Sequence, residues 1–270
     1  MPRNDTLPPT PSTPDTGAQP WSTPAERLRG RVAIVTGAAR GIGRAVARRY
    51  ARERAIVYAV DRVADELASE TQALRAEGCT VVAVALDVTD PAAVVALLER
   101  VDREAGRLDV LANVAGIIAL ERVDTTSVET FDAILAVNLR GPFLLMRAAV
   151  PLLRRSGGGV ILNVSSRAGI VGSALEAAYC ASKFGLEGLS RAAARDLEGD
   201  GIVVNTVTPG TPTRTAMSET TYGPEARAQW RDPDVITPAF VHLASQTPTG
   251  IHDQRVDAWA LSERLRARHA

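Results

Sequence analysis

The sequence of 270 residues lacks most of the features that mark secreted, metal-binding or membrane proteins. Its two cysteines, Cys79 and Cys180, cannot build a disulfide framework, and there is no C-x-x-C motif or His/Cys cluster for zinc. The apolar runs are too short to span a bilayer, and the first residues show no charged-then-apolar signal segment. We therefore expect a cytoplasmic protein that holds no metal and binds no membrane.

An excess of charge of either sign is also absent, because 31 acidic residues balance 31 basic ones. This balance gives no reason to expect nucleic acid or an anionic membrane surface as a partner. The basic residues are 30 arginines and a single lysine, Lys183. That ammonium group lies four residues after Tyr179, and on a helix this spacing places both side chains on one face.

The start of the chain differs in composition from the rest. Seven prolines fall within residues 1–24, and a segment with so little apolar surface cannot offset the entropy cost of ordering. We predict a disordered proline-rich tail over residues 1–28, one folded domain over 29–262 and a C-terminal tail over 263–270.

From residue 31 onward, Val/Ile-rich runs alternate with longer segments of helical spacing. Runs that are apolar throughout are typical of strands buried on both faces of a parallel sheet. The pattern therefore predicts one three-layer α/β domain with right-handed crossovers and helices on both faces. The strands are expected at 31–36, 55–61, 80–88, 108–114, 159–166, 202–209 and 251–257, and the helices at 41–54, 63–77, 91–105, 128–155, 176–198 and 234–245.

A glycine-rich turn, TGAARGIG (36–43), follows the first predicted strand. Glycine lets the backbone approach a phosphate, and a helix N-terminus offers N–H groups and the positive end of its dipole. The spacing is G-x-x-x-G-x-G rather than G-x-G-x-x-G, so the motif alone would also fit a plain tight turn. Its place between a strand and a helix predicts a dinucleotide pyrophosphate site at Gly37, Arg40, Gly41, Ile42 and Gly43.

Asp61 ends the second predicted strand. A carboxylate there can accept hydrogen bonds from both adenosine ribose hydroxyls and repels a 2′-phosphate, which favours NAD over NADP. Two alternatives stay open. Asp61 could cap a turn or a helix, and Arg40 and Arg62 could contact a 2′-phosphate if Asp61 turned away.

Two further strand ends complete the predicted cofactor site. Asp87 and Val88 end the third strand, on the side where an adenine ring would lie. Asn113, Ala115 and Gly116 end the fourth strand, where small residues admit a ribose. Parallel strands end at one edge of the sheet, where ligands bind in open α/β folds.

The spacing of Tyr179 and Lys183 predicts a site of proton transfer. A free tyrosine has a pKa of about 10, too high for a base at neutral pH, but a nearby ammonium and a bound nicotinamide cation both stabilise the phenolate. Tyr179 could then exchange a proton with an alcohol or ketone oxygen, as hydride transfer requires.

Ser166, just past the fifth strand, could hold that oxygen, although Ser165 competes for the role. Asn138 interrupts the long predicted helix at a cost in stability, and could serve a side-chain hydrogen bond or hold a water that links the lysine to solvent.

Taken together, these pieces resemble the short-chain dehydrogenase/reductase family. They fall in order across most of the chain: TGAARGIG (36–43), Asp61, DV (87–88), NVAG (113–116), Asn138, NVSS (163–166), YCASK (179–183) and PG (209–210). The resemblance implies a Rossmann-type, doubly wound sheet of about seven parallel strands. It also implies a catalytic tetrad in which Tyr179 is the acid/base, Ser166 orients the substrate oxygen, Lys183 binds the nicotinamide ribose and lowers the tyrosine pKa, and Asn138 holds a relay water.

The resemblance adds cofactor contacts at Pro209 and Gly210, and at the catalytic Tyr179 and Lys183 themselves. The family's carboxamide-binding threonine would fall at Arg214, so Thr213 or Thr215 must take that role, and Thr213 is our candidate. The family's common glycine-rich ending is replaced by VDAW (256–259). A homo-oligomer, a dimer or tetramer, is also implied.

We expect an NAD-dependent dehydrogenase that converts a secondary alcohol to a ketone. An NADPH-dependent ketone reductase and a non-catalytic nucleotide-binding protein are the alternatives. Arg167 and Glu176 could recognise a polar group of the substrate or simply be solvated. The substrate pocket is expected near Ile117, Ile118, Ala168, Leu175 and the segment 211–232, which could act as a lid.

Overall fold

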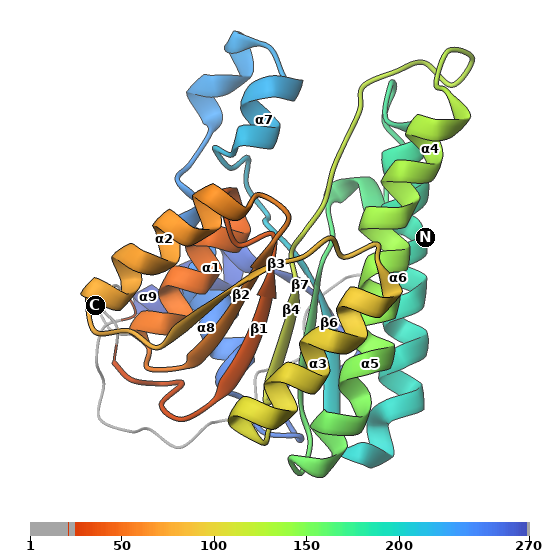
Figure 1. Cartoon of the computed structure of the whole chain (residues 1–270). Coiled ribbons are helices and arrows are strands. Elements are labelled where there is room, and N and C mark those ends of the chain that lie inside the picture. The colour runs from red at the N-terminus through yellow and green to blue at the C-terminus, as the bar shows by residue number, and fades with distance from the viewer. Residues whose placement is uncertain (1–20, 22–24, 269–270) are drawn as a thin grey trace, which may run out of the picture.

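The structure, a computed structural model, describes residue 21 and residues 25–268. In this part of the chain, seven parallel strands form one sheet in the order β3-β2-β1-β4-β5-β6-β7 (Figure 1). The expected Rossmann-type, doubly wound single domain is confirmed. The strands are β1 (Val32–Thr36), β2 (Ile56–Asp61), β3 (Val81–Ala85), β4 (Val110–Asn113), β5 (Gly159–Val164), β6 (Ile202–Thr208) and β7 (Arg255–Asp257).

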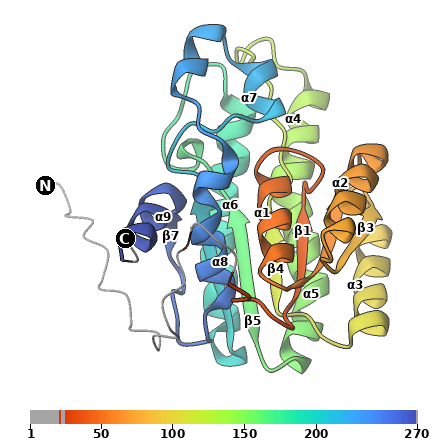
Figure 2. The same cartoon turned by 90° about the vertical axis from the view of Figure 1, so that its left-hand side faces the viewer.

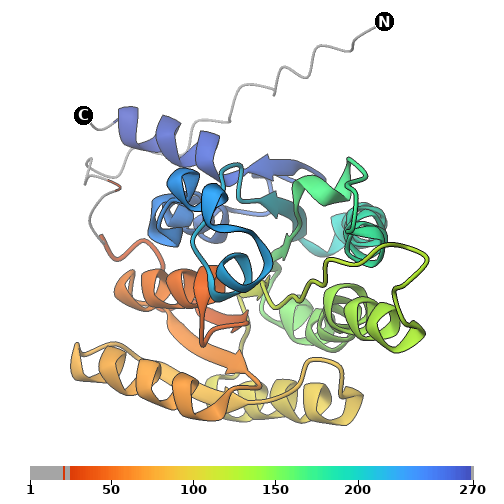
Figure 3. The same ribbon diagram turned by 90° about the horizontal axis from the view of Figure 1, so that it is seen from above.

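The sheet separates two hydrophobic cores, because successive side chains of a strand point to opposite faces. In β1, Ala33 and Val35 pack in one core, whereas Val32 and Ile34 pack in the other. Figure 3 shows the sheet between its two layers of helices. The first core is covered by α1 (Gly41–Arg52), α2 (Ala64–Ala76), α8 (Thr237–Ser245) and α9 (Ala258–Ala267), and the second by α3 (Pro91–Ala105), α5 (Gly141–Arg155) and α6 (Ala177–Leu197).

The long helix predicted over 128–155 contains a π-helical segment. Helix α4 (Val128–Leu135) joins α5 through η1 (Ala136–Arg140), and this wide turn carries the fully buried Asn138. Wide turns of this kind are frequent at functional sites. The whole helix is long and apolar enough to cross a membrane by length and composition. Leu145 and Leu153, however, are buried in the second core, so packing against the sheet accounts for its apolar character.

Several element ends differ from the predicted ones. Strand β3 stops at Ala85 and β7 begins only at Arg255. The polar stretch 211–232 contains α7 (Ala216–Thr221) and the 3-10 segment η4 (Pro224–Gln229), and η5 (Pro233–Ile236) precedes α8. The C-terminal boundary expected at residue 262 is too early, because α9 continues to Ala267 and buries Leu265.

The N-terminal boundary predicted at residue 28 is too late. Residues 1–20 and 22–24 lie outside the described residues, and so does the predicted disorder there. Trp21 and Leu28, however, are buried. Trp21 meets the ring of His242 edge to face at 5.9 Å, and the guanidinium of Arg27 stacks over it at 4.3 Å.

A buried carboxylate fastens the adjoining segment to α1. Glu53 accepts hydrogen bonds from the backbone N–H groups of Ala25 (2.9 Å) and Arg27 (3.0 Å). Its other oxygen pairs with the guanidinium groups of Arg27 and Arg49. These contacts could not be read from composition, because the acceptor lies far along the sequence.

Replacing Trp21 by alanine should destabilise the fold, because it opens a gap beside His242 and removes the ring under Arg27. We expect the free energy of unfolding to fall by about 3 kcal/mol and Tm by about 8 °C in thermal denaturation. Trp21→Phe should recover much of the loss, and Val123→Ala, at a residue 79% exposed, is the neutral control. An unchanged Tm in Trp21→Ala would show that residue 21 does not anchor this segment.

Candidate active site

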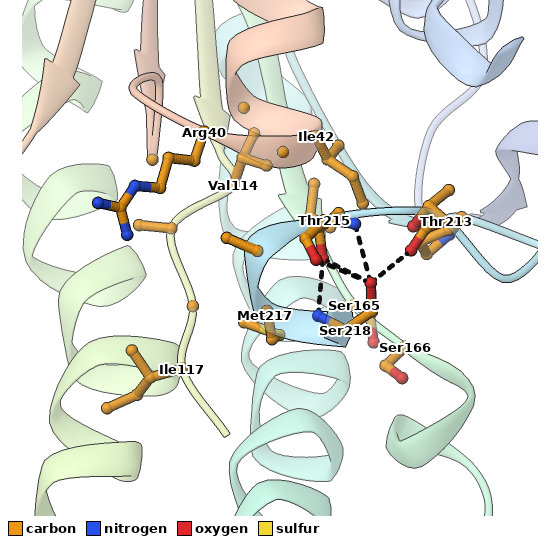
Figure 4. A pocket seen from close by; sticks show the side chains of 18 of the residues that line it. Arg40, Ile42, Val114, Ile117, Ser165, Ser166, Thr213, Thr215, Met217 and Ser218 are labelled. Carbon is orange, nitrogen blue, oxygen red and sulfur yellow. Dashed lines mark hydrogen bonds between the residues drawn. The ribbon is translucent and has the colours of Figure 1, made fainter. Parts of the chain in front are cut away.

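A cavity of about 450 Å³ opens at the carboxyl ends of the strands (Figure 4). Helix α7 lies beyond this end of the sheet (Figure 2). The walls of the cavity come from the glycine-rich turn, the ends of β2 and β5, the first turns of α6 and residues 209–230. A smaller hollow of about 110 Å³ shares several of these walls and reaches Asp87 and Val88. Open α/β sheets bind ligands at this edge, and the cleft gathers most of the predicted cofactor residues.

The turn between β1 and α1 permits a close approach to its backbone. Gly37 and Gly41 have φ angles of 68° and 55°, and a Cβ on Gly43 would overlap the carbonyl oxygen of Gly37. Within the described residues, no side chain caps the first turn of α1, so its N–H groups are available to an anion. Arg40 and Ile42 line the same cavity. The turn therefore fits a pyrophosphate.

Asp61 is held in position at the end of β2. Its Oδ1 accepts a hydrogen bond from the N–H of Val63 and its Oδ2 one from the N–H of Ala39, both at 3.0 Å. The carboxylate lines both the cavity and the smaller hollow. Arg40, which could have met a 2′-phosphate, is paired instead with Glu66. The wall at this end of the cleft therefore carries the carboxylate of Asp61, and the guanidinium of Arg40 is already paired.

The smaller hollow contains the other predicted strand ends. Asp87 accepts hydrogen bonds from the N–H (2.9 Å) and the hydroxyl (2.8 Å) of Thr89. These bonds hold the pKa of Asp87 below its ordinary value, so the group is anionic at neutral pH. Val88, Ala115 and Gly116 complete this part of the cleft.

Asn113 and Gly210 lie behind the cleft rather than in its walls. Asn113 Nδ2 donates to Asn163 Oδ1 at 2.8 Å inside the sheet. A Cβ on Gly210 would overlap the carboxylate of Asp257, so this position needs glycine for packing against β7. Both residues support the cleft, and their direct contact with the cofactor stays a prediction. Pro209 and Thr213 do line the cavity.

Asn138 fastens the π-helical segment to its neighbours. Its Oδ1 accepts from the N–H of Ile117 at 2.8 Å, and its Nδ2 donates to the carbonyl of Ile117 (2.9 Å) and to the hydroxyl of Ser182 (3.0 Å). The first of the two explanations for a mid-helix asparagine, a side-chain hydrogen bond, is therefore present. Its contact with a relay water stays a prediction.

Tyr179, Ser166 and Lys183 meet in the cavity. Lys183 Nζ donates to the carbonyl of Val164 at 2.8 Å and lies 5.6 Å from the centre of the Tyr179 ring. The hydroxyl of Ser166 is near enough to the phenol of Tyr179 to favour its ionised form. Ser165 also lines the cavity, but its buried hydroxyl has no partner among the described residues. Of the two serines, Ser166 is the one that favours the phenolate of Tyr179, and it is also the one that the family resemblance implies.

Burial controls the protonation of this pair. It raises the pKa of Tyr179 to about 12, against the lowering effect of the nearby Ser166 hydroxyl, and Tyr222 and Glu176 add to the rise. Burial likewise lowers the pKa of Lys183 to about 8. The expected lowering of the tyrosine pKa by Lys183 is thus not met in the protein alone, because desolvation of the phenol outweighs it. Tyr179 is a neutral phenol at neutral pH.

The segment after β6 packs onto the glycine-rich turn. A Cβ on Gly41 would lie 3.1 Å from the side chain of Thr215. Thr215 caps α7 by accepting from the N–H of Ser218 at 3.0 Å, and the hydroxyl of Ser218 donates to the carbonyl of Thr213 at 2.9 Å (Figure 4). Both threonines line the cavity. The assignment of the carboxamide contact to Thr213 stays a prediction.

Sequence reasoning missed an ion pair behind the catalytic residues, formed by Glu187 of α6 and Arg255 of β7. One local signal was available, since Glu187 follows Lys183 by one helical turn and shares its face. Its partner lies far along the chain, where no local pattern reveals it.

A nucleotide cleft with a tyrosine–lysine pair defines a class, the α/β oxidoreductases that use a nicotinamide cofactor. Residues 31–225 match the family model for short chain dehydrogenases, so the chain belongs to that family. It is 38% identical to the D-threitol dehydrogenase of Mycolicibacterium smegmatis, over 84% of this chain and 90% of that relative. It is 39% identical to the galactitol 2-dehydrogenase of Agrobacterium fabrum, over 68% of this chain and 71% of that relative.

A solved structure from Beutenbergia cavernae, with NADP bound at low occupancy, matches with a TM-score of 0.80 at 32% identity. The match covers 87% of this chain and 98% of that chain. Together, these similarities identify the protein as an oxidoreductase of the short-chain dehydrogenase type that acts on alcohols.

Lys183→Met should stabilise the protein at neutral pH, because the buried ammonium opposes folding. Its pKa is about 8 in the folded protein against an ordinary 10.5, so the unfolded chain binds more protons between these values, and the stability of the unaltered protein rises with pH across that window. We expect the variant to gain about 1–3 kcal/mol below pH 8 and to lose this advantage towards pH 10.5.

Chemical denaturation at pH 7 and at pH 10 measures this difference. A variant less stable than the unaltered protein at pH 7 would show that the bond from Nζ to Val164 contributes more than burial costs.

Proposed function

We propose that the protein is an NAD-dependent dehydrogenase that converts a secondary alcohol to a ketone, with Tyr179 as the acid/base. The observation that carries this proposal is the group in the cavity. It consists of the phenol of Tyr179 and the hydroxyl of Ser166, which line the cavity together, and a buried ammonium, Lys183, one helical turn after the phenol. The glycine-rich turn supports it, because an uncapped helix N-terminus beside small residues fits a pyrophosphate.

A bound nicotinamide would supply hydride transfer to or from the substrate carbon that carries the oxygen. Ser166 holds the substrate oxygen beside Tyr179. In the ketone direction, the neutral phenol donates its proton to that oxygen. In the alcohol direction Tyr179 receives the proton, so its phenolate must form first. Positive charge nearby, from Lys183 and from the cofactor, lowers the cost of that ionisation.

The charges around the adenosine ribose favour NAD. Asp61 keeps acceptor capacity beyond its two backbone hydrogen bonds, and Glu66 occupies Arg40. A 2′-phosphate would therefore meet the carboxylate of Asp61 and would find Arg40 already paired. The runner-up is an NADPH-dependent ketone reductase, which is favoured by Arg62 in the walls of both hollows and by the NADP in the relative's structure.

Asp61→Asn should weaken NADH binding by about tenfold, or about 1.4 kcal/mol, because the ribose hydroxyls lose a charged acceptor. Glu66→Gln, which frees Arg40, should strengthen NADPH binding and leave NADH nearly unchanged. Fluorescence titration with both reduced cofactors measures these constants. Tighter binding of NADPH than of NADH by the unaltered protein would overturn the preference for NAD.

For the substrate, we propose an alcohol with further hydroxyl groups. The outer cavity presents Tyr222, whose hydroxyl donates to Oε1 of Glu176 at 3.2 Å, beside Met217 and Trp230. A phenol and a carboxylate can bind a second hydroxyl, and two relatives are dehydrogenases of the polyols threitol and galactitol. A panel of polyols and simple secondary alcohols, followed by NADH absorbance, tests this. A preference for simple alcohols would contradict it.

We also propose that the protein forms a homo-oligomer, a dimer or a tetramer. Large apolar side chains stay exposed on neighbouring helices: Val128 and Phe131 of α4, Phe143 of α5 and Phe184 of α6. A second copy would remove them from water. Sedimentation of the full chain as a monomer at micromolar concentration would contradict this assembly.

Tyr179→Phe should abolish turnover, because the substrate oxygen loses its proton partner. The dissociation constant for NADH should change by less than about twofold, since the phenol contributes little to binding the pyrophosphate. Steady-state assays and cofactor titration on one preparation measure both effects. Turnover retained in the variant would remove Tyr179 from the mechanism, and no turnover in the unaltered protein with any substrate would favour the non-catalytic alternative.

A further inference from the structure

Glu187 of α6 is a buried carboxylate, 9% exposed, that the proposed chemistry does not use. Its Oε2 accepts a hydrogen bond from the hydroxyl of Thr206 at 2.8 Å, and its Oε1 accepts one from Nε of Arg255 at 3.0 Å. Thr206 belongs to β6 and Arg255 to β7. Glu187 therefore fastens α6, the helix of Tyr179 and Lys183, to two strands of the sheet.

Arg255 carries this connection to the catalytic serine. Its Nη2 donates to the backbone carbonyl of Ser166 at 2.8 Å, so one guanidinium bridges the carboxylate and the residue that holds the substrate oxygen. The 3-10 turn η2 (Arg167–Gly169), which follows Ser166, packs on the side chain of Glu187. A Cβ on Gly169 would lie only 3.1 Å from Cγ of Glu187. Arg255 therefore bonds to the residue just before this turn, and Glu187 packs against the turn itself.

Glu187 also lies on the same face of α6 as Lys183, which precedes it by one helical turn. Its charge favours the ammonium form and opposes the effect of burial. The other titratable group beside the lysine is Tyr179 on the same helix. Other elements bring the carbonyl of Val164 and the amide of Asn138 towards the lysine, and both groups are uncharged. Among the described residues, Glu187 is therefore the anion that balances this ammonium.

We propose that the Glu187–Arg255 ion pair is a positioning element of the active site: Arg255 fixes the backbone of Ser166, and Glu187 supplies the negative charge that keeps Lys183 protonated. The first effect rests on the proposed function, because it concerns the catalytic serine. The second effect is independent of the reaction.

The single lysine of the chain makes the charge effect directly measurable. With ¹³C at the lysine Cε, NMR of the full chain reports the titration of Lys183 alone. In Glu187→Gln, a negative charge is lost and Arg255 becomes uncompensated. We expect the midpoint of the titration to fall by about one pH unit. A purely structural pair would give the opposite result, since loosened packing admits water and moves the midpoint up, towards 10.5.

Glu53→Gln is the matched control, because Glu53 is also a buried carboxylate paired with arginines, at a place away from the cavity. It should lose stability without moving the Lys183 midpoint. A midpoint in Glu187→Gln that stays in place or rises would overturn the charge effect.

Kinetics test the positioning effect. Arg255→Gln releases the carbonyl of Ser166 and should lower kcat by about tenfold. The dissociation constant for NADH should stay within about twofold, because neither Glu187 nor Arg255 lines the cavity. An unchanged kcat would overturn this part. An unaltered protein without dehydrogenase activity would instead contradict the proposed function, and the lysine titration would still decide the charge effect.

Glu187→Asp keeps the proposal testable if a glutamine variant does not fold. It preserves the charge but withdraws the carboxylate from Thr206 and Arg255. The lysine midpoint should stay within a few tenths of a pH unit while kcat falls. A fall in kcat of the same size in Glu53→Gln would show a general loss of stability instead.

Discussion

Taking the ammonium group of Lys183 out of water costs free energy, and one hydrogen bond to the carbonyl of Val164 returns only part of it. Much of the surrounding structure can be understood from this constraint. The end of β5 supplies the carbonyl, the π-helical turn brings the buried Asn138 beside the loop of Gly116, and the charge of Glu187 favours the ammonium form. The phenol of Tyr179 lies one helical turn away, with its ring centre 5.6 Å from Nζ, where a positive charge can stabilise a phenolate.

The second constraint is that the ligand groups lie on separate strands. A parallel sheet brings β1, β2, β4 and β5 to one edge, so the glycine-rich turn, Asp61, Gly116 and Ser166 share a cleft although they are far apart in sequence. Close contact at this edge requires glycine where a Cβ would strike the backbone, as at Gly43. The same edge fixes the charges at the adenosine end, where Asp61 is held by two backbone N–H groups and Arg40 is occupied by Glu66.

Local pattern predicted the sheet, most helices and the placement of Tyr179 and Lys183 in one cavity, because strand runs, the strand–turn–helix motif and the tyrosine–lysine spacing are all short-range features. Local pattern did not predict contacts between segments that lie far apart in the sequence. Trp21 is ordered by His242, and Glu187 finds its partner on β7. The pKa of Tyr179 was misjudged for the same reason: spacing shows that an ammonium is near, but not that the phenol is buried deeply enough to reach a pKa of about 12. The hydrogen bond of Asn113 to Asn163 in the next strand was not predicted either, because the sequence does not show which partner a strand-end asparagine meets.

The central claim is that Tyr179 carries the proton and that positive charge makes its ionisation accessible. With four tyrosines in the chain, ¹³C at the tyrosine Cζ gives few signals, and Tyr179→Phe identifies the one of interest. A pH titration without and with saturating NAD⁺ measures the ionisation directly. We predict a pKa of about 12 for Tyr179 in the protein alone and a fall of several units when the cationic cofactor binds. A tyrosine whose titration is the same with and without NAD⁺ would contradict the account.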